Sequence, residues 1–541
     1  MKSSVRNCSY DQTQSTRCLL VYPEFTLASF WNFRAACELR GAKYPSIPLG
    51  LLTVAGLLPA HWDLRLVDCN VESLRDDDIA WADLVFVGGM LPQQPTALEV
   101  IDRSRRLGKR VVVGGPDATS SPHLYDAADY QVLGEAEITL PRWLDDFQLG
   151  KASHRYEQGT GKADISSTPP PRFDLIRLDR YLYPAVQFGR GCPFLCEFCD
   201  IIELFGRVPR LKSPEQILKE LDALYALGHR GHVDFVDDNF VGNKRDVKKF
   251  LPQLIQWQRD HNWPFEFSTE ASINLADDEE LLKLMQAAGF AMIFVGIESP
   301  DEETLRLMQK RQNTKRSLVE SLGKIYDHGM VVNTGYIIGF DNERGSVARG
   351  ILDLIDAGTT PVNMVGLLFA LPGTQLTRRL AREGRLHDGF DRVVAATESG
   401  DQCSFGINFE STRPRVDILR DLRDVVAESY AAENYFDRVR RVCERLNCSQ
   451  KQLNQRPRDV VRDLTGFAKL NWIQGIAKPY RRHYWKMLTS VARRNPKALR
   501  YAVGLAALYL HFADFSPFVL KKLDEAIAQC DAETPLQTAS A

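Results

Sequence analysis

Short apolar runs alternate with longer amphipathic stretches between residue 18 and about residue 150. Each run ends in a turn residue or a glycine, and segments with a helical repeat, such as PTALEVIDRSRRLG, separate them. Strands that are apolar along their whole length are typical of a parallel sheet that helices cover on both faces. The pattern predicts a doubly wound α/β domain over 18–150, whose ligands bind beyond the carboxyl ends of the strands. The predicted strands are CLLVYP, LRLVDC, LVFVGGM, RVVVGGP and YQVLGE.

A polar linker separates this domain from a second series of alternating strands and helices. Residues 151–180 are polar and contain three consecutive prolines, which favour an extended chain. Six strands with intervening helices then fill 181–385. Six strands rather than eight predict a partial (β/α)6 barrel, in which chemistry takes place at the carboxyl ends of the strands. The predicted strands lie in AVQFGRGC, HVDFVDDNF, FEFSTEAS, MIFVGIES, VVNTGYIIGF and NMVGLLFA.

The last part of the chain has a different pattern. Apolar positions three and four apart predict a mostly helical region over 386–530. Its most apolar segment, Tyr501 to Phe512, is too short to span a membrane and predicts a buried helix. The polar ends, 1–17 and 531–541, are typical of disordered tails. The predicted fold class is therefore α/β, with two parallel-sheet domains followed by helices.

The composition is that of a globular protein, with 44% hydrophobic and 26% charged residues. The formal net charge of -2 disfavours a general affinity for nucleic acid or acidic membranes. The N-terminal segment lacks the apolar core of a signal peptide. The 11 cysteines, an odd number, are widely scattered apart from one cluster. These features indicate a reducing cytoplasm rather than a disulfide framework.

The one cysteine cluster follows the first strand of the second series, in a loop that contains glycines. Cys192, Cys196 and Cys199 have the spacing CxxxCxxC. Thiolates are the usual ligands of iron–sulfur clusters, and three of them can bind three irons of a cubane and leave the fourth open. A structural zinc site is one alternative, but it usually takes two separated pairs of ligands; no second pair is evident, and Cys403 is isolated. A chance grouping is the other alternative.

The run CPFLCEFC after a strand resembles the signature of the radical S-adenosylmethionine (SAM) superfamily. The resemblance implies that the three cysteines hold a 4Fe-4S cluster whose open iron chelates SAM. It further implies reductive cleavage of SAM to a 5′-deoxyadenosyl radical, which abstracts hydrogen from an unreactive C–H bond. The cofactors would carry this chemistry, while the protein positions the reacting atoms and excludes water.

The same resemblance assigns further strand ends to SAM binding. The second strand ends in Asp237-Asp238-Asn239, where the common form of the superfamily has Gly-Gly-Glu to contact the SAM amino group; an acidic turn that caps a helix is the alternative. Glu270 and Glu298 end the third and fourth strands, where side chains of a barrel face the site. For Glu270 a salt bridge is an equal alternative. Near the ribose and adenine the resemblance places Glu298, Gly335, Gly339 and Phe198, the last of which either stacks near adenine or packs in the core.

The first domain resembles the flavodoxin-like cobalamin-binding domain that precedes the barrel in one large subclass of radical SAM enzymes, class B. Glycines at strand ends let a bulky macrocycle approach the backbone. The histidine motif that supplies a cobalt ligand in many other cobalamin proteins is absent, and Asp68-Cys69-Asn70 stands in its place. A degenerate domain that binds nothing is the alternative. The residues that carry the resemblance are Pro48, Gly50, Gly114, Gly115, Gly134 and Glu135.

Within this subclass the sequence resembles the hopanoid C-2 methylase group, through the stretch WADLV, the GGM turn, the run CEFCDII and the helical C-terminal region. The resemblance implies a methyltransferase that uses SAM, a 4Fe-4S cluster and cobalamin on an unactivated carbon of a lipid-like or secondary-metabolite substrate. A cobalamin-containing oxidative cyclase or rearrangement enzyme and a non-catalytic cobalamin or redox sensor are the alternatives. The expected partners are the substrate and an external electron donor such as a flavodoxin or ferredoxin, with no nucleic acid and at most peripheral membrane contact.

Overall fold

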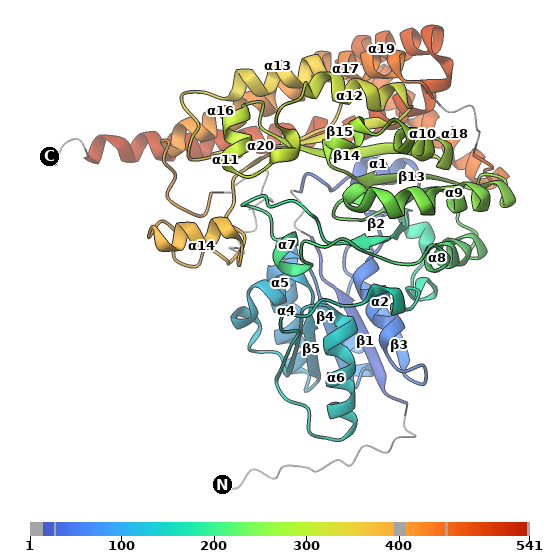
Figure 1. The fold of residues 1–541 in the computed structure, drawn as a ribbon, viewed down its shortest axis with the longest axis vertical. Helices are drawn as coiled ribbons and strands as arrows, with labels where there is room; N and C mark the ends of the chain where they lie inside the picture. The colour runs from blue at the N-terminus through green and yellow to red at the C-terminus, as the bar shows by residue number, and fades with distance from the viewer. Residues whose placement is uncertain (1–14, 26–28, 394–406, 449–452, 538–541) are drawn as a thin grey trace.

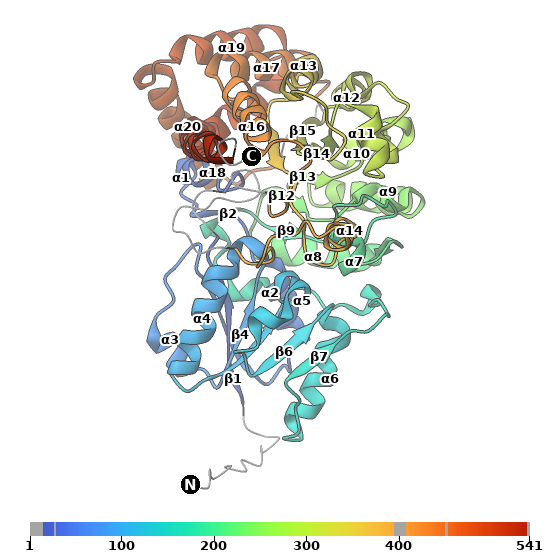
Figure 2. The same cartoon turned by 90° about the vertical axis from the view of Figure 1, so that its left-hand side faces the viewer.

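Three parts are stacked along the long axis of the protein (Figure 1). The structure is a computed structural model, and it describes residues 15–25, 29–393, 407–448 and 453–537. A doubly wound α/β domain lies at one end, a partial barrel lies in the middle, and a layer of helices covers the barrel at the other end (Figure 2). The fold class predicted from the sequence is confirmed.

The first domain is built on a six-stranded sheet in which all neighbouring strands pair in parallel, in the order β3-β1-β4-β5-β6-β7. The strands are β1 (Arg17–Tyr22), β3 (Asp63–Asp68), β4 (Leu84–Gly88), β5 (Arg110–Gly114), β6 (Tyr130–Leu133) and β7 (Arg155–Glu157). The helices are α2 (Leu49–Leu57), α3 (Asp76–Trp81), α4 (Gln94–Arg106), α5 (Pro116–Ser120) and α6 (Ala136–Gln148). Val21, Val85 and Val113 are buried on the face that α3 and α4 cover, and on the other face Phe86 meets Trp143 of α6. Burial on both faces explains the continuous apolar runs.

Several short elements tie the first domain to the barrel, and the sequence did not predict them. β7 joins the edge of the first sheet although its residues are mostly polar. β2 (Tyr44–Ser46) pairs in parallel with β8 (Tyr181–Tyr183). The segment predicted as an extended linker therefore contains a strand and several short 3-10 turns. The tail predicted at the N-terminus lies outside the described residues as far as residue 14, and β1 already begins at Arg17.

The middle part is a second six-stranded parallel sheet, in the order β16-β15-β14-β13-β12-β9, and it contains every predicted strand of the second series. On β12, Val233 and Phe235 are buried beneath the outer helices, whereas His232 and Asp234 point to the inner face and stay accessible. The strands are β9 (Ala185–Val186), β12 (Gly231–Phe235), β13 (Phe265–Glu270), β14 (Phe290–Glu298), β15 (Val331–Ile338) and β16 (Asn363–Leu367), and a separate pair consists of β10 (Gly189–Arg190) and β11 (Arg210–Leu211). The helices are α7 (Ile201–Leu204), α8 (Pro214–Ala226), α9 (Lys244–Asp260), α10 (Glu279–Ala288), α11 (Glu302–Leu307), α12 (Leu318–Asp327), α13 (Ala348–Gly358) and α14 (Gln375–Arg382).

The C-terminal part is helical, as predicted. It covers one edge of the barrel through α16, which packs on β16 and α13. Tyr430, at the end of α16, stacks on Phe512 with ring centroids 4.4 Å apart, and Phe30 and Phe33 of the first domain contact the same ring. Its elements are α16 (Arg415–Ser429), α17 (Ala432–Arg445), α18 (Pro457–Trp472), a π-helical turn η9 (Ile473–Ala477), α19 (Arg481–Arg494) and α20 (Leu499–Gln537), while α1 (Arg34–Leu39) of the first domain packs on α18 and α20.

Helix α20 is longer than the short buried helix that the sequence predicts. By length and composition alone it is long and apolar enough to cross a membrane. It lies along α16, α17 and α1, however, and Tyr509, Phe512 and Val519 are buried in that packing. Its far end continues to Gln537, where a tail was expected, and Arg420 of α16 pairs with Asp531 there at 3.0 Å. Helix packing therefore accounts for much of the apolar character of this segment.

Candidate active site

Cys192, Cys196 and Cys199 lie in the loop between β10 and α7. The pairing of β10 with β11 closes this loop at its base. Gly191 enters the loop with φ +91°, and a Cβ there would lie 2.8 Å from the carbonyl oxygen of Gly206, so a larger residue would force the backbone to move. The Cys192 amide donates a hydrogen bond to the same oxygen at 3.2 Å. The backbone therefore fixes the cysteine loop, residues 191–200, on the barrel.

Two amide side chains direct N–H groups at cysteine sulfurs. Asn239 Nδ2 lies 3.7 Å from Cys192 Sγ, and Gln312 Nε2 lies 3.8 Å from Cys196 Sγ. Hydrogen bonds to sulfur ligands tune the reduction potential of an iron–sulfur cluster and orient the ligands. Asn239 is one of the residues predicted to bind SAM. Gln312 lies in a 3-10 turn between α11 and α12, without a recognisable motif, and no pattern in the sequence points to it.

The cysteine loop fits a cubane cluster better than a single metal ion. Within the described ranges, no three or more His, Cys, Asp or Glu side chains are placed to hold one metal ion. Thiolates of a cubane bind different irons and need not converge on one point. Burial raises the pKa of Cys196 and of Cys199, so a bound cation is needed to keep these sulfurs ionised at neutral pH. Cys403, the isolated cysteine considered as a zinc ligand, lies outside the described residues.

The acidic turn after β12 holds the start of the cysteine loop. The buried carboxylate of Asp237 accepts hydrogen bonds from the amides of Phe188, at 3.0 Å, and Gly189. Asp238 accepts one from the amide of Gly191 at 2.8 Å. Burial raises the pKa of Asp237 to about 8 and that of Asp238 to about 6. Both oxygens of Asp237 are thus engaged by the protein backbone, which makes it a positioning residue for the loop.

Glu298, at the end of β14, is paired within the protein. It is buried, has φ +67°, and binds the Lys310 ammonium at 2.5 Å. Burial disfavours the charge of Lys310, but Glu298 and the sulfurs of Cys196 and Cys199 raise its pKa. Lys310 therefore brings a positive charge close to the cysteine loop. Like Gln312, it lies between α11 and α12 and was not predicted.

Glu270, at the end of β13, remains unpaired. Its side chain is accessible, and its carboxylate makes no hydrogen bond or ion pair with any described residue. Protein nevertheless surrounds it, so that burial and the negative charges of Asp234 and Asp238 raise its pKa to about 8, while Lys310 opposes the shift. An unpaired carboxyl group in such surroundings is a ready acceptor for a cationic or hydroxyl group of a ligand.

The end of β15 meets the residue before the third cysteine. The rings of Phe198 and Phe340 lie 6.1 Å apart, so Phe198 packs against the residue that follows Gly339. Gly339 has φ +113°, and its amide donates a hydrogen bond to Glu343 at 3.1 Å. A Cβ on Gly335 would lie 3.1 Å from the ring of Phe294. The structure therefore places Phe198 against the residue next to Gly339; the predicted proximity of both to adenine stays a prediction.

A chain of polar side chains crosses the inner faces of β12 and β13. His232 Nε2 lies 2.7 Å from Ser268 Oγ, and the Ser268 hydroxyl donates a hydrogen bond to Asp234. The ring of Tyr183 meets His232 edge-on at 5.2 Å. Glu266 extends the chain toward the far end of the barrel, where it pairs with an arginine of α20. The signal was present in the sequence, since polar residues occupy alternate positions of both strands.

The predicted cobalamin glycines fall into two groups. A Cβ on Gly114 would lie 2.8 Å from a backbone oxygen of β6, and Gly115 and Gly134 have φ of +93° and +88°. Backbone approach and conformation therefore already require glycine at these three positions. Gly50 differs, because no other part of the protein lies within 4 Å of where its Cβ would be. With Pro48 before it at the start of α2, Gly50 offers open backbone to a ligand.

Glu135 joins the first domain to the cysteine loop. Its carboxylate is bound by Arg210 at 2.9 Å, Arg190 at 3.2 Å and the amide of Ala163 at 2.9 Å. Arg190 also pairs with Glu137 at 2.9 Å. Both carboxylate oxygens are used in this way, and the predicted place of Glu135 at the cobalamin site stays a prediction. Glu135 couples the carboxyl edge of the first sheet to the strand pair beneath the cysteine loop.

The loop that replaces the cobalt-ligand motif is filled by its own hydrogen bonds. Asp68 is buried and accepts hydrogen bonds from the Asn70 side chain at 2.7 Å and from the Tyr181 hydroxyl at 2.8 Å. Asn70 in turn accepts one from the amide of Phe25 at 2.9 Å. These contacts fix the end of β3 against β8 without an imidazole.

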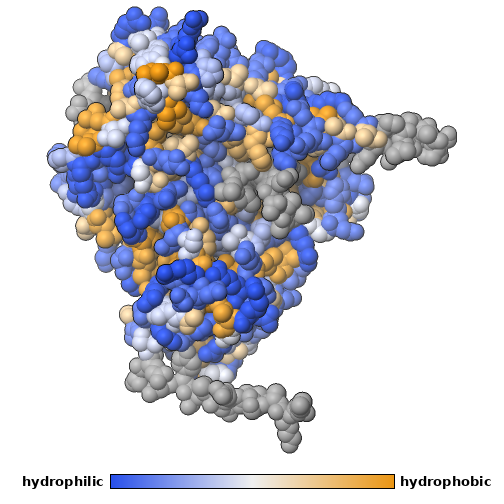
Figure 3. Space-filling view, turned by 180° about the vertical axis from the view of Figure 1, so that it is seen from behind, coloured by the Kyte–Doolittle hydropathy of each residue, from blue (hydrophilic) through white to orange (hydrophobic). Residues whose placement is uncertain are grey.

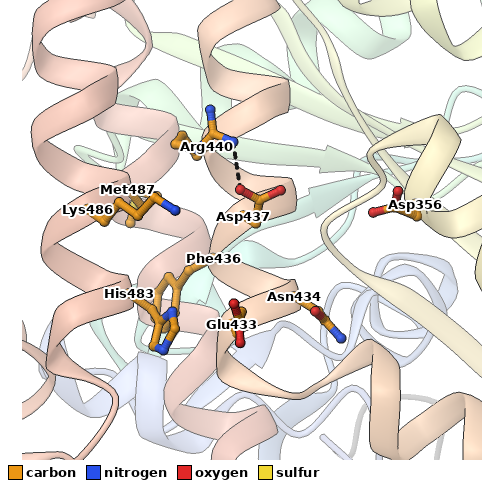
Figure 4. Close-up of a pocket in the computed structure, with 9 residues that line it drawn as sticks. All are labelled: Asp356, Glu433, Asn434, Phe436, Asp437, Arg440, His483, Lys486 and Met487. Atoms are coloured by element: carbon orange, nitrogen blue, oxygen red, sulfur yellow. Dashed lines mark hydrogen bonds and ion pairs between the residues drawn. The ribbon is translucent and has the colours of Figure 1, made fainter.

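A polar pocket of about 190 Å³ lies elsewhere, between α17 and α19 (Figure 4). Glu433 and Asp437 line one wall, where Asp437 pairs with Arg440 at 2.6 Å, and His483 and Lys486 project from the facing helix. The pocket contains none of the residues predicted to bind SAM or cobalamin. Its place in the outer helical layer separates it from the cysteine loop.

Three family models match successive parts of the chain. The B12 binding domain matches residues 39–144, the radical SAM superfamily matches 186–355, and a domain of unknown function (DUF4070) matches 374–525. The first two correspond to the doubly wound domain and to most of the partial barrel with its cysteine loop. The third corresponds to the C-terminal helices.

Relatives match along nearly the whole chain. The chain is 40% identical over 511 residues to an uncharacterized methyltransferase of Synechocystis sp., an alignment that covers 94% of each protein. It is 34% identical over 485 residues to the hopanoid C-2 methylase of Rhodopseudomonas palustris, which covers 87% of this chain and 88% of that protein. The similarity therefore extends well beyond the barrel.

Two solved structures share the fold. The cobalamin-dependent SAM radical enzyme OxsB, solved with aqua-cobalamin bound, covers 95% of this chain and 81% of its own with a TM-score of 0.58 and 14% identity. The radical SAM methyltransferase TsrM from Kitasatospora setae, solved with cobalamin and a [4Fe-4S] cluster, covers 68% of this chain and 78% of its own with a TM-score of 0.55 and 18% identity. At these identities the likeness establishes the common fold.

Proposed function

The chain belongs to the cobalamin-dependent radical SAM enzyme family, and on that premise we propose that it methylates an unactivated carbon of a lipid-like substrate, with Cys192, Cys196 and Cys199 holding a 4Fe-4S cluster. The similarity to hopanoid C-2 methylase over 87% of this chain carries the proposal. A second relative, which aligns over 94% of this chain, is also a methyltransferase. The two cyclases among the relatives align over only 60% and 55% of this chain, each at 25% identity.

The protein's part in this reaction is to hold and orient its cofactors. When bound, SAM and the cluster supply a radical that removes hydrogen from an unreactive carbon, and cobalamin supplies the methyl group. Asn239 and Gln312 orient cysteine sulfurs through their N–H groups. Asp237 and Asp238 fix the backbone that leads into the cysteine loop. Ligands that are held in place before the cofactor arrives lose little conformational freedom when it binds.

Glu270 is our candidate for the amino group or ribose hydroxyls of SAM. The lack of a protein partner among the described residues supports this role, because the carboxylates of Asp237 and Glu298 are already engaged. Its raised pKa of about 8 reflects surroundings in which a cationic ligand would stabilise the ionised form. Phe198, which packs on Phe340, and the neighbouring Gly339 are the candidates for the adenine side.

An apolar wall on the inner side of the barrel supports a lipid-like substrate. Trp31 of the first domain meets Phe294 of β14 with ring centroids 5.5 Å apart, yet it stays 39% exposed. Burying such a surface against a hydrocarbon skeleton favours binding. The neighbouring polar chain from His232 to Asp234 offers hydrogen-bond partners to a hydroxyl group of the same substrate.

The proposal includes an external electron donor and a cytoplasmic setting. Cleavage of SAM is reductive, so a one-electron donor such as a flavodoxin or ferredoxin is needed. Outside the cysteine loop, Cys18, Cys37 and Cys443 are buried free thiols, in keeping with a reducing compartment. We include no nucleic acid among the partners.

The test is anaerobic turnover of the protein reconstituted with iron, sulfide and cobalamin, with SAM that carries a deuterated methyl group. A pentacyclic triterpene hydrocarbon is offered as the lipid-like substrate, and a chlorin as the control substrate. We expect a labelled methyl group in the triterpene product, together with 5′-deoxyadenosine and S-adenosylhomocysteine. A labelled chlorin with an unchanged triterpene would overturn the substrate class, and a changed product without label would favour the cyclase or rearrangement alternative.

A further inference from the structure

Helices α18 and α19 carry an exposed apolar surface that the fold does not cover. Val461, Leu464 and Trp472 are 63%, 62% and 64% exposed, although most large hydrophobic side chains of the protein are buried. The full surface, which we name the outer apolar face, consists of Val460, Val461, Leu464, Trp472, Ile476 and Trp485. Figure 3 shows hydrophobic atoms gathered among hydrophilic ones in the upper left of the rear view, where these helices lie.

Most of the outer apolar face lies along one side of α18, and Trp485 of α19 adjoins it, because its indole N–H donates a hydrogen bond to the carbonyl of Gly475 in η9 at 2.9 Å. At ~100° per residue, Val460, Val461, Leu464 and Trp472 lie within about 120° of one another around α18, so they form one stripe, and Ile476 follows in η9. The opposite side of α18 packs on the first domain, because a Cβ on Gly466 would lie 2.9 Å from a backbone oxygen of α1. The stripe therefore points away from the core, and a soluble surface rarely tolerates a large contiguous apolar patch without a partner.

Basic side chains surround the outer apolar face. Residues 457–500 contain eleven lysines and arginines but only two aspartates, in a chain whose overall formal charge is -2. Both aspartates are already paired, Asp459 with Arg456 at 2.9 Å and Asp463 with Arg40 at 2.8 Å. Lys469, Arg481 and Arg482 form no ion pair with any described residue. The surface is therefore locally cationic, although the whole protein carries a small net negative charge.

We propose that the outer apolar face docks on the surface of a lipid bilayer that carries anionic headgroups. An exposed apolar stripe that contains tryptophan and is flanked by lysine and arginine is the pattern of a helix that lies in the membrane interface. Trp472 and Trp485 would sit at headgroup depth, where indole rings are favoured, and the basic residues would contact lipid phosphates. The exposure and the charge of this surface support docking by themselves. Only the purpose of docking, which is to reach a substrate dissolved in lipid, rests on the proposed function.

The first experiment is sedimentation of the full-length protein with vesicles of phosphatidylcholine, with or without phosphatidylglycerol. We expect binding to the anionic vesicles that weakens as salt rises, because screening acts on exposed charges. Trp472→Ser should lower the partition coefficient roughly tenfold, since burying an indole is worth more than one decade in an equilibrium constant. The matched control is Val208→Ser, which removes a 74% exposed side chain from the barrel loops and should leave binding unchanged. Equal loss in both variants, or unchanged binding of Trp472→Ser, would overturn the proposal.

A second experiment separates docking on a bilayer from self-association of the chain and from the proposed reaction. If the outer apolar face were an interface between copies of the chain, Trp472→Ser would change the sedimentation coefficient in the absence of vesicles, and that result would also overturn the proposal. Turnover distinguishes docking from the proposed reaction. The docking variant should keep wild-type activity on substrate dispersed in detergent and lose it on substrate embedded in vesicles. Wild-type protein that binds vesicles but turns over neither form would refute the function and leave the docking surface intact.

Discussion

Replacing Glu135 by glutamine should loosen the cysteine loop without touching a cysteine. The Glu135 side chain is 1% exposed and sits between Arg190 and Arg210, whose side chains are 12% and 17% exposed. Glutamine keeps the shape of the side chain but removes its charge, so Arg210 loses its carboxylate partner. Arg190 keeps Glu137 at 2.9 Å. The perturbation therefore falls mainly on β11 and on the base of the loop.

The expected magnitude follows from the burial of these groups. Removing one partner of a buried ion pair costs about 3–5 kcal/mol. Because Arg190 still pairs with Glu137, we expect the lower end of this range, about 3 kcal/mol. If the free energy of local opening of the cysteine loop falls by this amount, the population of the open state rises roughly a hundredfold. Solvent screening reduces the effect little, because all three side chains are mostly buried.

Amide hydrogen exchange over residues 189–212 measures this opening directly. Protection there should fall roughly a hundredfold in Glu135→Gln, and iron bound after reconstitution should fall with it. The control is Asp179→Asn, which breaks an ion pair with Arg177 whose partners are 64% and 68% exposed; exposed pairs contribute about 0–1 kcal/mol, so exchange should stay unchanged. Wild-type protection over 189–212 in a folded Glu135→Gln variant would show that Glu135 does not hold the loop.

Three further changes test the site. Glu270→Gln should weaken SAM binding at least tenfold at pH 8.5 without changing iron content, because a hydrogen bond to a charged group contributes about 1.5–3 kcal/mol; equal affinity by equilibrium dialysis would contradict the assignment. Since the pKa of Glu270 is raised to about 8 by burial, the carboxyl is protonated below that pH, so wild-type affinity should rise from pH 6.5 to 8.5 and that of Glu270→Gln should stay flat. Gln312→Leu removes an N–H group from Cys196 and should make the cluster harder to reduce; a potential unchanged in a spectroscopic redox titration would show that the contact is not used. Trp31→Ala should raise KM for the lipid-like substrate with little change in kcat, and an unaltered KM would place the substrate elsewhere.

The backbone of the site could be predicted from sequence because its signals are local. Apolar runs specify strands that are buried on both faces, and the cysteine spacing lies within one loop. β7 was missed because a polar edge strand such as RYE has no apolar run. The end of α20 was missed because residues 531–537, DAETPLQ, are mostly polar and include a proline.

The side-chain contacts of the site depend on elements far apart in the chain, which single-sequence patterns do not connect. Gln312 reaches Cys196 across 116 positions of sequence, and Glu135 meets Arg210 across 75. The sequence places Glu135 after a glycine at a strand end, but it does not reveal that two arginines from the barrel bind its carboxylate. Glu270 and Glu298 also differ through a contact that the local sequence pattern does not show. Both end strands, and only the position of Lys310 decides which of them is paired.

A comparison of Cys196→Ala with Cys448→Ala tests the cluster assignment directly. The two side chains are buried to a similar degree, with Cys196 7% and Cys448 8% exposed, but only Cys196 lies in the cysteine loop. After anaerobic reconstitution, Cys448→Ala should bind iron and inorganic sulfide in equal amounts, show the paramagnetic spectrum of a reduced 4Fe-4S cluster, and cleave SAM like the wild type. Cys196→Ala should do none of these. Undiminished cleavage of SAM by Cys196→Ala, or a wild-type protein that holds zinc and no sulfide, would contradict a 4Fe-4S cluster in this loop.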